Sequence, residues 1–328
     1  MYAQVIKRFG CPTVFEAAEV ARPVPREGEV LIMVKATSVN RLDLKIRAGM
    51  LPALTPEFPA ILHGDVAGVV EEVGQGVTKF SVGDRVFGCA GGVKGMGGAL
   101  AEYMLADEHL ITEIPPGIDF DEAALYPLVA MTAWDAMIER MHIKEGDRVL
   151  IHGGTGGVGH LALQLAKWKK AQVFTTVKKE NMPLAQSLGA DIAIDYKAMR
   201  PKEYTEIYTE NEGFDYIFDT VGGTHLDQSF EAIKHNGTIV TTVSRGTYDL
   251  SLMHRKGATL STVFMIIPLL DGIGRDHFSE KLFKISQLMD KKQLKVLKDK
   301  EVFSLDAISS AHSYMEAKEH RGKILVKI

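Results

Sequence analysis

A cluster of glycines between an apolar run and a helical pattern is the part of this sequence whose chemistry is easiest to predict. Val149 to Ile151 form the apolar run, and the turn Gly154-Thr155-Gly156-Gly157-Val158-Gly159 follows. Leu161, Leu165 and Trp168 are then spaced for one face of a helix. Glycines let a pyrophosphate approach the backbone, and the free N–H groups that begin the helix attract its negative charge. The spacing therefore predicts a dinucleotide site between a strand and a helix.

The residues after the next strand-like run indicate which nucleotide this turn accepts. An acidic residue about twenty positions beyond the glycines is typical of NAD sites, because it bonds the ribose 2′-hydroxyl. Gln172–Val177 is followed instead by Lys178 and Lys179, and no carboxylate occurs before Glu180. The 2′-phosphate of NADP needs cations and hydroxyl donors, which Thr176, Lys178 and Lys179 supply. A lysine pair often only ends a strand at the surface, but the missing acid favours NADPH.

Composition limits the class of protein. The 328 residues suit two domains that each bury a core, and the formal net charge is −4. A nucleic-acid surface needs a dense basic patch, which this charge argues against. The two cysteines, Cys11 and Cys89, are far apart and suit a reducing compartment. The N-terminus lacks a signal-peptide pattern, and the apolar run from Leu260 to Leu270 is too short to span a bilayer. We expect a soluble, cytoplasmic protein without a membrane or nucleic-acid partner.

Two secondary-structure patterns divide the chain. The first third contains short β-like runs between turns and ends near Pro115-Pro116-Gly117, which indicates a compact, mostly β domain. From Phe120 onward, strand-like and helix-like patterns alternate, beginning with a helix expected at 123–141. Such alternation is typical of a parallel, doubly wound sheet, which binds cofactors beyond the carboxyl ends of its strands. The strands expected there are Arg148–His152, Gln172–Val177, 192–194, 216–219 and 238–243, with helices at 160–170, 183–188 and 226–233. After residue 270 the pattern leaves open whether the chain extends this domain or returns to the first one.

Motifs spread over nearly the whole length resemble the medium-chain dehydrogenase/reductase superfamily, and most closely its zinc-free NADPH:quinone oxidoreductase branch. Besides the HGGTGGVG turn, the motifs are SVNRLD (38–43), GDVAGVV (64–70), VGDRV (82–86), LVAMTAW (128–134), LGAD (188–191), DTVGG (219–223) and RGKI (321–324). The resemblance implies an α/β protein with a GroES-like, mostly β catalytic domain and a Rossmann domain with a doubly wound parallel sheet. Residues 1–122 and 265–328 then form the catalytic domain, and residues 123–264 form the Rossmann domain between them. The resemblance also implies a homodimer in which a strand at 259–267 pairs with its copy.

The resemblance separates this chain from zinc-dependent relatives, which bind their catalytic zinc through an early cysteine, a His-Glu pair after a glycine, and a second cysteine or an aspartate. Here Asn40 stands at the place of the first cysteine, and Leu128 falls near that of the second. His63 precedes Gly64 instead of following it. Asparagine is a poor zinc ligand compared with thiolate or imidazole. We therefore expect no metal and interpret His63 as a packing or turn residue.

Without zinc to acidify an alcohol, the expected chemistry is hydride transfer from NADPH to a quinone or to an alkene conjugated to a carbonyl. The resemblance implies that Asn40 and Thr132 are catalytic and lie near the nicotinamide, the first as an amide donor and the second through its hydroxyl. The cofactor contacts that it implies are Asn40, Thr132, Gly154, Thr155, Gly156, Gly157, Val158, Tyr196, Ser244, Phe264 and Lys318. Of these, Tyr196 and Lys318 are expected to flank the adenosine phosphate. Asp43 and Arg47 are spaced for one helical turn and suit an ion pair as well as a catalytic role. The proton donor stays open.

Three functions are compatible with these residues. A quinone oxidoreductase is the leading interpretation, and an alkenal or enone double-bond reductase on the same scaffold is the alternative. The sequence separates them poorly, because both need an open apolar cleft and the same cofactor. A non-enzymatic NADPH- or RNA-binding protein is the third interpretation, which the net charge and the lack of an aromatic and basic strip disfavour.

Overall fold

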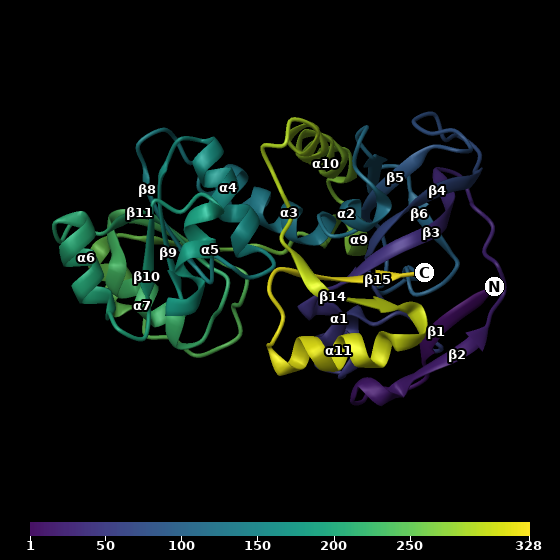
Figure 1. Ribbon diagram of the computed structural model, residues 1–328, viewed down its shortest axis with the longest axis horizontal. Coiled ribbons are helices and arrows are strands. Elements are labelled where there is room, and N and C mark those ends of the chain that lie inside the picture. Colours follow the sequence, from purple (N-terminus) through teal and green to yellow (C-terminus); the bar gives the residue numbers. More distant parts are fainter. The chain divides into compact units, whose positions relative to one another are not determined.

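The computed structural model describes residues Met1–Ile328 and divides the chain into two compact units. Unit 1 consists of Met1–Met131, Ile266–Lys292 and Val296–Ile328, so both ends of the chain contribute to it. Unit 2 consists of Thr132–Met265 with the short segment Gln293–Lys295. Figure 1 follows the chain from the first unit into the second and back. No helix combines the length and the apolar character that crossing a membrane requires.

Unit 1 is built around a seven-stranded sheet in the order β14-β15-β3-β4-β5-β7, with β6 also paired to β3. Its longest strand, β3, is mostly buried, and only the β14–β15 pairing is parallel. The last strand of the chain, β15, pairs with β3 so that Ile324 lies opposite Val39, which joins the C-terminal residues to the N-terminal part of the sheet. The strands are β3 (Glu29–Val39), β4 (Asp65–Val73), β5 (Arg85–Cys89), β6 (Tyr103–Asp107), β7 (Ile111–Glu113), β14 (Lys298–Ser304) and β15 (Lys323–Lys327).

Helices and 3-10 turns connect the strands of unit 1. The first helix, α1 (Arg41–Arg47), follows β3 directly because Asn40 has an extended backbone and asparagine is favoured just before a helix. A separate two-stranded ribbon is formed by β1 (Tyr2–Ile6) and β2 (Phe15–Glu19). The other helices are α2 (Phe120–Ala123), α9 (Ile267–Asp271), α10 (Arg275–Asp290) and α11 (Ile308–Ala317), with 3-10 turns at Pro12–Val14, Pro52–Leu54 and Leu305–Ala307.

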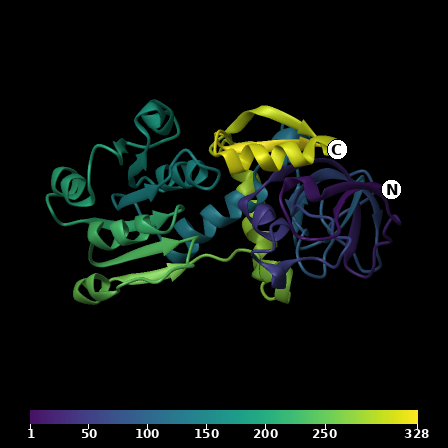
Figure 2. The same cartoon turned by 90° about the horizontal axis from the view of Figure 1, so that it is seen from below.

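Unit 2 is a parallel sheet of six strands in the order β10-β9-β8-β11-β12-β13, with helices on both faces (Figure 2). Leu150, Phe174 and Ile217 on the strands pack with helix residues in its core. The chain leaves β8 toward β9 and later returns to β11 on the other side of β8, and doubly wound sheets bind their ligands where the order reverses in this way. The strands are β8 (Arg148–His152), β9 (Gln172–Val177), β10 (Ile192–Asp195), β11 (Phe214–Asp219), β12 (Ile233–Thr241) and β13 (Thr259–Thr262). The helices are α4 (Gly159–Trp168), α5 (Met182–Ser187), α6 (Pro201–Thr209), α7 (Thr224–Ala232) and α8 (Ser251–Lys256), with a 3-10 turn at Lys179–Asn181.

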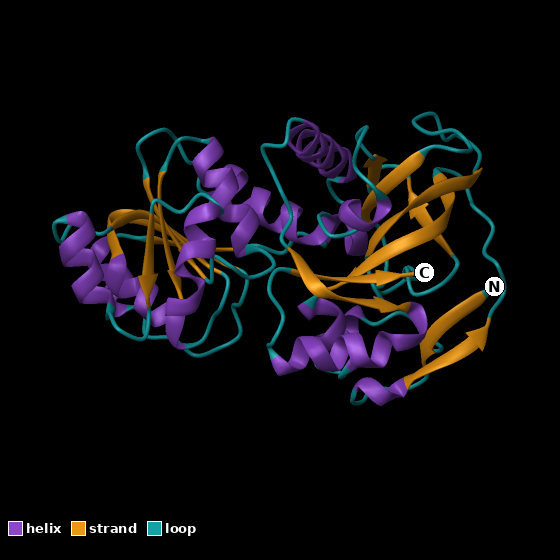
Figure 3. Cartoon of the chain, in the orientation of Figure 1, coloured by secondary structure: helices purple, strands orange, loops and turns teal.

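The expected α/β class is confirmed, since helices and strands occur in both units and one of the two large sheets is wholly parallel (Figure 3). The single helix expected at 123–141 is wrong. The structure has α2, then α3 (Pro127–Trp134), then a π-helix at Asp135–Arg140, because Pro127 lacks a backbone N–H and starts a helix instead of lying inside one. The strand expected at 259–267 is shorter, since β13 ends at Thr262 and Pro268 lies in the first turn of α9.

Candidate functional site

The glycine turn lies between β8 and α4, the two elements that the sequence predicted around it. Gly153 has a left-handed backbone with φ +77°, which lets the chain leave the strand sharply. An added Cβ at Gly154 would lie 2.2 Å from Thr175 Oγ1, and one at Gly159 would lie 2.2 Å from the Gly153 oxygen. Glycine at 154 and 159 is therefore needed for the turn to pack against β9 and against itself.

Gly156 differs from these tightly packed glycines. A Cβ there would approach only the Gly153 oxygen, at 3.2 Å. The N–H groups of Gly157 and Val158 have no acceptor within the chain, and the first turn of α4 carries no acidic residue. A pyrophosphate needs free backbone N–H donors at the start of a helix, and it needs room beside them that no side chain fills. The residues present therefore fit the pyrophosphate of a dinucleotide.

Four residues expected to contact the cofactor, Thr176, Lys178, Lys179 and Tyr196, lie at the carboxyl ends of neighbouring strands in unit 2. Thr176 of β9 is buried, and its Oγ1 lies 2.7 Å from His152 Nδ1. Lys178 and Lys179 follow β9 and are exposed to solvent, and Tyr196 follows β10. Because β8, β9 and β10 are parallel neighbours, the structure brings the turn, the lysines and the tyrosine to one edge of the sheet.

A histidine that the sequence analysis missed lies at the same edge. The ring of His225, in the first turn of α7, lies 5.8 Å from the rings of both Tyr196 and His152, measured between centroids. His225 Nδ1 and His152 Nε2 are buried without hydrogen-bond partners. Burial lowers the pKa of His152 to about 4, so this ring is neutral at pH 7. No motif marks His225, because only the packing of α7 onto the sheet brings it to this edge.

Three further residues expected at the cofactor, Ser244, Phe264 and Thr132, lie elsewhere in unit 2. Ser244 follows β12, and Phe264 follows β13 with 47% of its surface exposed. Thr132 lies in α3 and is buried. Asp219 ends β11 and accepts hydrogen bonds from the N–H groups of residues 221 and 222, both at 2.9 Å, which orders the loop after this strand. Ser244 and Phe264 thus follow strands on the opposite side of β8 from the lysines.

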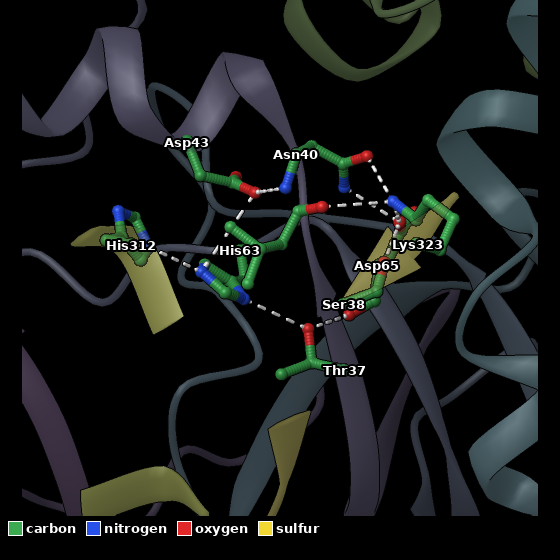
Figure 4. Close-up of polar contacts among 9 residues, drawn as sticks. Thr37, Ser38, Asn40, Asp43, His63, Asp65, His312 and Lys323 are labelled. Atoms are coloured by element: carbon green, nitrogen blue, oxygen red, sulfur yellow. Dashed lines mark hydrogen bonds and ion pairs between the residues drawn. The ribbon is translucent and has the colours of Figure 1, made fainter. Parts of the chain in front are cut away.

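In unit 1, Asn40 lies between β3 and α1. Its backbone N–H donates to Asp43 Oδ2 at 2.8 Å, which caps the helix. The residue is 3% exposed, and both ends of its side-chain amide have partners. Nδ2 donates to Asp65 Oδ2 at 2.8 Å, and Oδ1 accepts from Lys323 Nζ at 2.5 Å (Figure 4). The orientation of the amide is therefore fixed by an acceptor on one side and a donor on the other.

A buried ion pair of Asp65 and Lys323 adjoins this amide, with 3.4 Å between Nζ and Oδ2. Asp65 begins β4, and its carboxylate also accepts hydrogen bonds from the Ser38 hydroxyl at 2.6 Å and the Leu128 N–H at 2.8 Å. Burial lowers the pKa of Lys323, and the carboxylate opposes that shift. Sequence reasoning gave neither partner a role, because their contact joins residues 258 positions apart. The sequence feature that could have pointed to them is their place in two motifs, since GDVAGVV contains Asp65 and RGKI contains Lys323.

His63 belongs to a buried histidine pair beside these residues. It has a left-handed backbone with φ +71°, its ring stacks on that of His312, and the two Nε2 atoms lie 2.9 Å apart. Its Nδ1 lies 3.3 Å from Thr37 Oγ1. Burial lowers the pKa of His63 to about 3 and raises the pKa of Asp43 to about 8. At pH 7 both groups are mostly neutral, so neither adds much charge beside Lys323 and Asp65.

The donor set around Asn40 does not fit zinc. The Asn40 oxygen and the Asp65 carboxylate are already occupied by N–H and O–H donors, and His63 Nε2 is occupied by His312. A metal cation between Asn40 and Asp65 would also be repelled by the Lys323 ammonium that contacts both. No group of three or more His, Cys, Asp or Glu residues has a geometry that holds a metal ion. Zinc-free catalysis itself stays a prediction.

One interpretation of the sequence is wrong: Asp43 and Arg47 do not form the ion pair that their spacing suggested. Arg47 pairs instead with Glu316 of α11, while Asp43 accepts from the backbone of Asn40. Asp43 is used as a helix cap because it is the third residue of α1. Lys318, expected near the adenosine phosphate, ends α11 and belongs to unit 1, whereas the other residues expected there belong to unit 2.

Known proteins match this chain over most of its length. A family model described as zinc-binding dehydrogenase matches residues 188–326, and one described as alcohol dehydrogenase GroES-like domain matches residues 26–116. The quinone oxidoreductase of Pongo abelii is 31% identical over 253 residues, which are 76% of this chain and 75% of that protein. The chloroplastic NADPH-dependent alkenal/one oxidoreductase of Arabidopsis thaliana is 31% identical over 317 residues, which are 94% of this chain and 74% of that protein. The crystal structure of an alcohol dehydrogenase superfamily protein from Novosphingobium aromaticivorans is similar with a TM-score of 0.95 at 38% identity, and the match covers 100% of this chain and 99% of that one.

Proposed function

The chain belongs to the quinone oxidoreductase branch of the medium-chain dehydrogenase/reductase superfamily and is an NAD(P)-dependent oxidoreductase, and on this premise we propose that it transfers a hydride from NADPH to a quinone without zinc. The observation that carries the proposal is the Asn40 amide, which bonds Asp65 and the Lys323 ammonium at the place where zinc-dependent relatives have a metal ligand. A chain with an ammonium at this place cannot activate an alcohol as a zinc enzyme does. It suits acceptors that are electrophilic before they bind, and quinones are such acceptors.

The preference for NADPH is supported by the charge and spacing of unit 2. The N–H groups of Gly157 and Val158 would hold the pyrophosphate, with Gly154, Thr155 and Gly156 forming the rest of the turn. Lys178, Lys179 and Thr176 would bind the 2′-phosphate, and Tyr196 would lie against the adenosine. NADPH, when bound, supplies the hydride. A related protein that is NADPH-dependent by name supports the same choice.

The roles of the chain's own residues follow from where charge develops. A quinone gains negative charge on its oxygen as it is reduced, and a preorganised N–H donor stabilises that charge. We assign this donor to Asn40 and the orientation of the nicotinamide to the Thr132 hydroxyl, with Ser244 and Phe264 bordering the ring and Lys318 near the adenosine phosphate. In this proposal residues 1–122 and 265–328 form the catalytic domain, and residues 123–264 form the cofactor domain.

Reduction of an alkenal or enone is the second candidate, and a specific relative favours it. The Arabidopsis thaliana protein named as an alkenal/one oxidoreductase matches 94% of this chain, a larger share than the Pongo abelii quinone oxidoreductase does. An enone also gains negative charge on its carbonyl oxygen when a hydride reaches its β-carbon, so the Asn40 donor suits it equally. The acceptor therefore has to be decided by turnover.

The proposal includes a cytoplasmic homodimer. β13 lies at the edge of the six-stranded sheet, and most of its residues are exposed, which leaves unpaired backbone groups for a second copy of the strand. The cytoplasmic location is supported by two cysteines that are both free in the fold.

Parallel assays of NADPH oxidation test the function. The purified protein is mixed with NADPH and either phenanthrenequinone or an α,β-unsaturated aldehyde of similar apolar area, each over a range of concentrations. We expect kcat/KM to be higher for the quinone, and higher with NADPH than with NADH. A strong preference for the aldehyde would replace the first candidate by the second. Absence of turnover with both acceptors would contradict the proposal that the chain reduces such acceptors.

A further inference from the structure

Lys323 is enclosed within unit 1, with an exposure of 1%. The pairing of β15 with β3 places it there, because Ile324 lies opposite Val39 and the preceding residue reaches the start of α1. Its Nζ contacts three oxygens: that of the Val39 backbone at 3.2 Å, Asn40 Oδ1 at 2.5 Å and Asp65 Oδ2 at 3.4 Å. An ammonium has three N–H groups. All of them are used inside the protein, so Lys323 has none left to bind a substrate.

These contacts decide which way the Asn40 amide is turned. With Oδ1 at Lys323 and Nδ2 at Asp65, each end of the amide meets a partner of the right kind. Turning the amide over would point its N–H groups at an ammonium and its oxygen at a carboxylate, which is electrostatically unfavourable at both ends. Nδ2 has two hydrogens, and only one of them has a partner within the chain. The second N–H is the donor that this orientation leaves over.

We propose that Lys323, held by Asp65, is a positioning residue that keeps the Asn40 amide turned so that its second N–H serves the acceptor oxygen of the substrate. The inference rests on the proposed function, in which Asn40 is the donor. It adds the physical reason why the donor keeps its orientation: a buried ammonium binds the amide oxygen where related enzymes use a metal. Figure 4 displays the contact of Lys323 with the amide oxygen and that of Asp65 with the amide nitrogen.

A purely structural role of the ion pair predicts something different. In that case Lys323 and Asp65 would only join β15 to β3 and β4, and removal of the ammonium would change stability without changing the chemistry of Asn40. If Lys323 positions the amide, its removal lets the amide rotate and the N–H is presented only part of the time. Loss of one preorganised donor typically lowers turnover by about 10²-fold. We expect that decrease in kcat for Lys323→Met, with the Kd of NADPH changed less than about twofold.

Selective ¹⁵N labelling of asparagine reads the amide directly, before any assay of activity. The chain contains four asparagines, at positions 40, 181, 211 and 236, so few side-chain signals overlap. The signal of Asn40 is identified by its loss in Asn40→Ala. We expect Lys323→Met to shift this signal and to speed its exchange with water, and Lys323→Arg to restore it by keeping the charge. An Asn40 signal in Lys323→Met that matches the wild-type signal would overturn the proposal.

Lys327→Met is the matched control. Lys327 is the last residue of the same strand, is exposed, and pairs with Asp121. It should leave both the Asn40 signal and kcat unchanged. A shift of the Asn40 signal in this control as large as the one in Lys323→Met would mean that any change in β15 moves the amide, which also contradicts the proposal.

Kinetics separate a failure of this inference from a failure of the proposed function. We expect Asn40→Ala and Lys323→Met to lower kcat by similar factors. The variant that combines Asn40→Ala with Lys323→Met should have a kcat little lower than that of either single variant. An unchanged kcat in Asn40→Ala would overturn the donor role and with it the proposed chemistry. A wild-type kcat in Lys323→Met beside an impaired Asn40→Ala would overturn the positioning role alone. If Lys323→Met does not fold, a variant that combines Lys323→Met with Asp65→Asn removes both charges of the ion pair. This variant then replaces Lys323→Met in the measurement of the Asn40 signal and in that of kcat, with the same expected results.

Discussion

Alanine at position 154 or 156 separates the two roles that we assign to the glycine turn. In Gly154→Ala, the new Cβ would lie 2.2 Å from Thr175 Oγ1 and 3.0 Å from Leu163 Cδ1. Thr175 cannot yield cheaply, because its hydroxyl donates to the Ile151 oxygen at 2.6 Å and accepts from the Gly154 N–H at 3.2 Å. Overpacking of this kind costs roughly 2 kcal/mol, and disturbed buried hydrogen bonds cost about 2 kcal/mol more. We expect unit 2 to lose about 4 kcal/mol of stability.

In Gly156→Ala, the added Cβ meets only the Gly153 oxygen, at 3.2 Å, and the backbone φ is not left-handed. The small crowding is offset by the lower entropy of the unfolded chain, so stability should change by less than about 1 kcal/mol. The methyl group would instead occupy space that we assign to the pyrophosphate. Loss of one charge-assisted hydrogen bond costs about 1.5–3 kcal/mol. The Kd of NADPH should therefore rise roughly 10- to 100-fold.

Tryptophan fluorescence and calorimetry measure these two effects separately. Both tryptophans, Trp134 and Trp168, belong to unit 2, so their emission during urea unfolding reports this unit. Titration calorimetry gives the Kd of NADPH for each variant under native conditions. Wild-type NADPH affinity in a folded Gly156→Ala protein would refute the assignment of the turn to the pyrophosphate. Equal losses of stability in the two variants would refute the packing argument.

Further predictions concern the nucleotide, the buried carboxyl and the thiols. Lys178→Glu should raise the Kd of NADPH about tenfold or more and that of NADH by less than about twofold. Lys144 lies before β8, at the amino ends of the strands, so Lys144→Glu should change neither Kd. Equal effects of Lys178→Glu on both nucleotides would contradict a contact with the 2′-phosphate. The pKa of Asp43 is raised to about 8 by burial. The stability that its protonation contributes is therefore fully present below about pH 4, the pKa of the unfolded chain, and is lost as pH rises from there through 8. Relative to Asp43→Asn, the wild-type protein should therefore lose about 1.4 kcal/mol of stability per pH unit between pH 5 and 7, and parallel curves in denaturant titrations would contradict the buried, protonated carboxyl. A disulfide reagent should modify one thiol per native chain, the exposed Cys11, whose pKa is lowered by its hydrogen bond with Thr13, and should reach the buried Cys89 only after unfolding.

The sequence predicted the cofactor unit better than the catalytic one. The strands expected at Arg148–His152 and Gln172–Val177 have these same bounds in the structure. Buried parallel strands are continuous apolar runs, and here glycines or lysines end them, so local pattern suffices. The single helix expected at 123–141 failed because an apolar pattern continues through Pro127, while the missing N–H of proline starts a new helix.

The surroundings of Asn40 could not be predicted from local spacing. Asn40 was selected because it replaces a metal ligand in a motif, but its partners Asp65 and Lys323 lie 25 and 283 positions away. Only the pairing of β15 with β3 brings Lys323 to the amide. The same limit explains the wrong ion pair of Asp43 with Arg47, since helical spacing gives no information about Glu316 at the other end of the chain. Long-range sheet register, more than residue type, decides which polar groups meet in unit 1.

Zinc content measured together with turnover decides whether hydride transfer in this protein needs a metal. The protein is dialysed against a chelator, its zinc is determined by elemental analysis, and the same sample is mixed with NADPH and phenanthrenequinone. We predict full turnover by chains that hold far less than stoichiometric zinc, because Lys323 already supplies a cation to Asn40 and Asp65. Activity that disappears with the metal and returns with stoichiometric Zn²⁺ would contradict this chemistry.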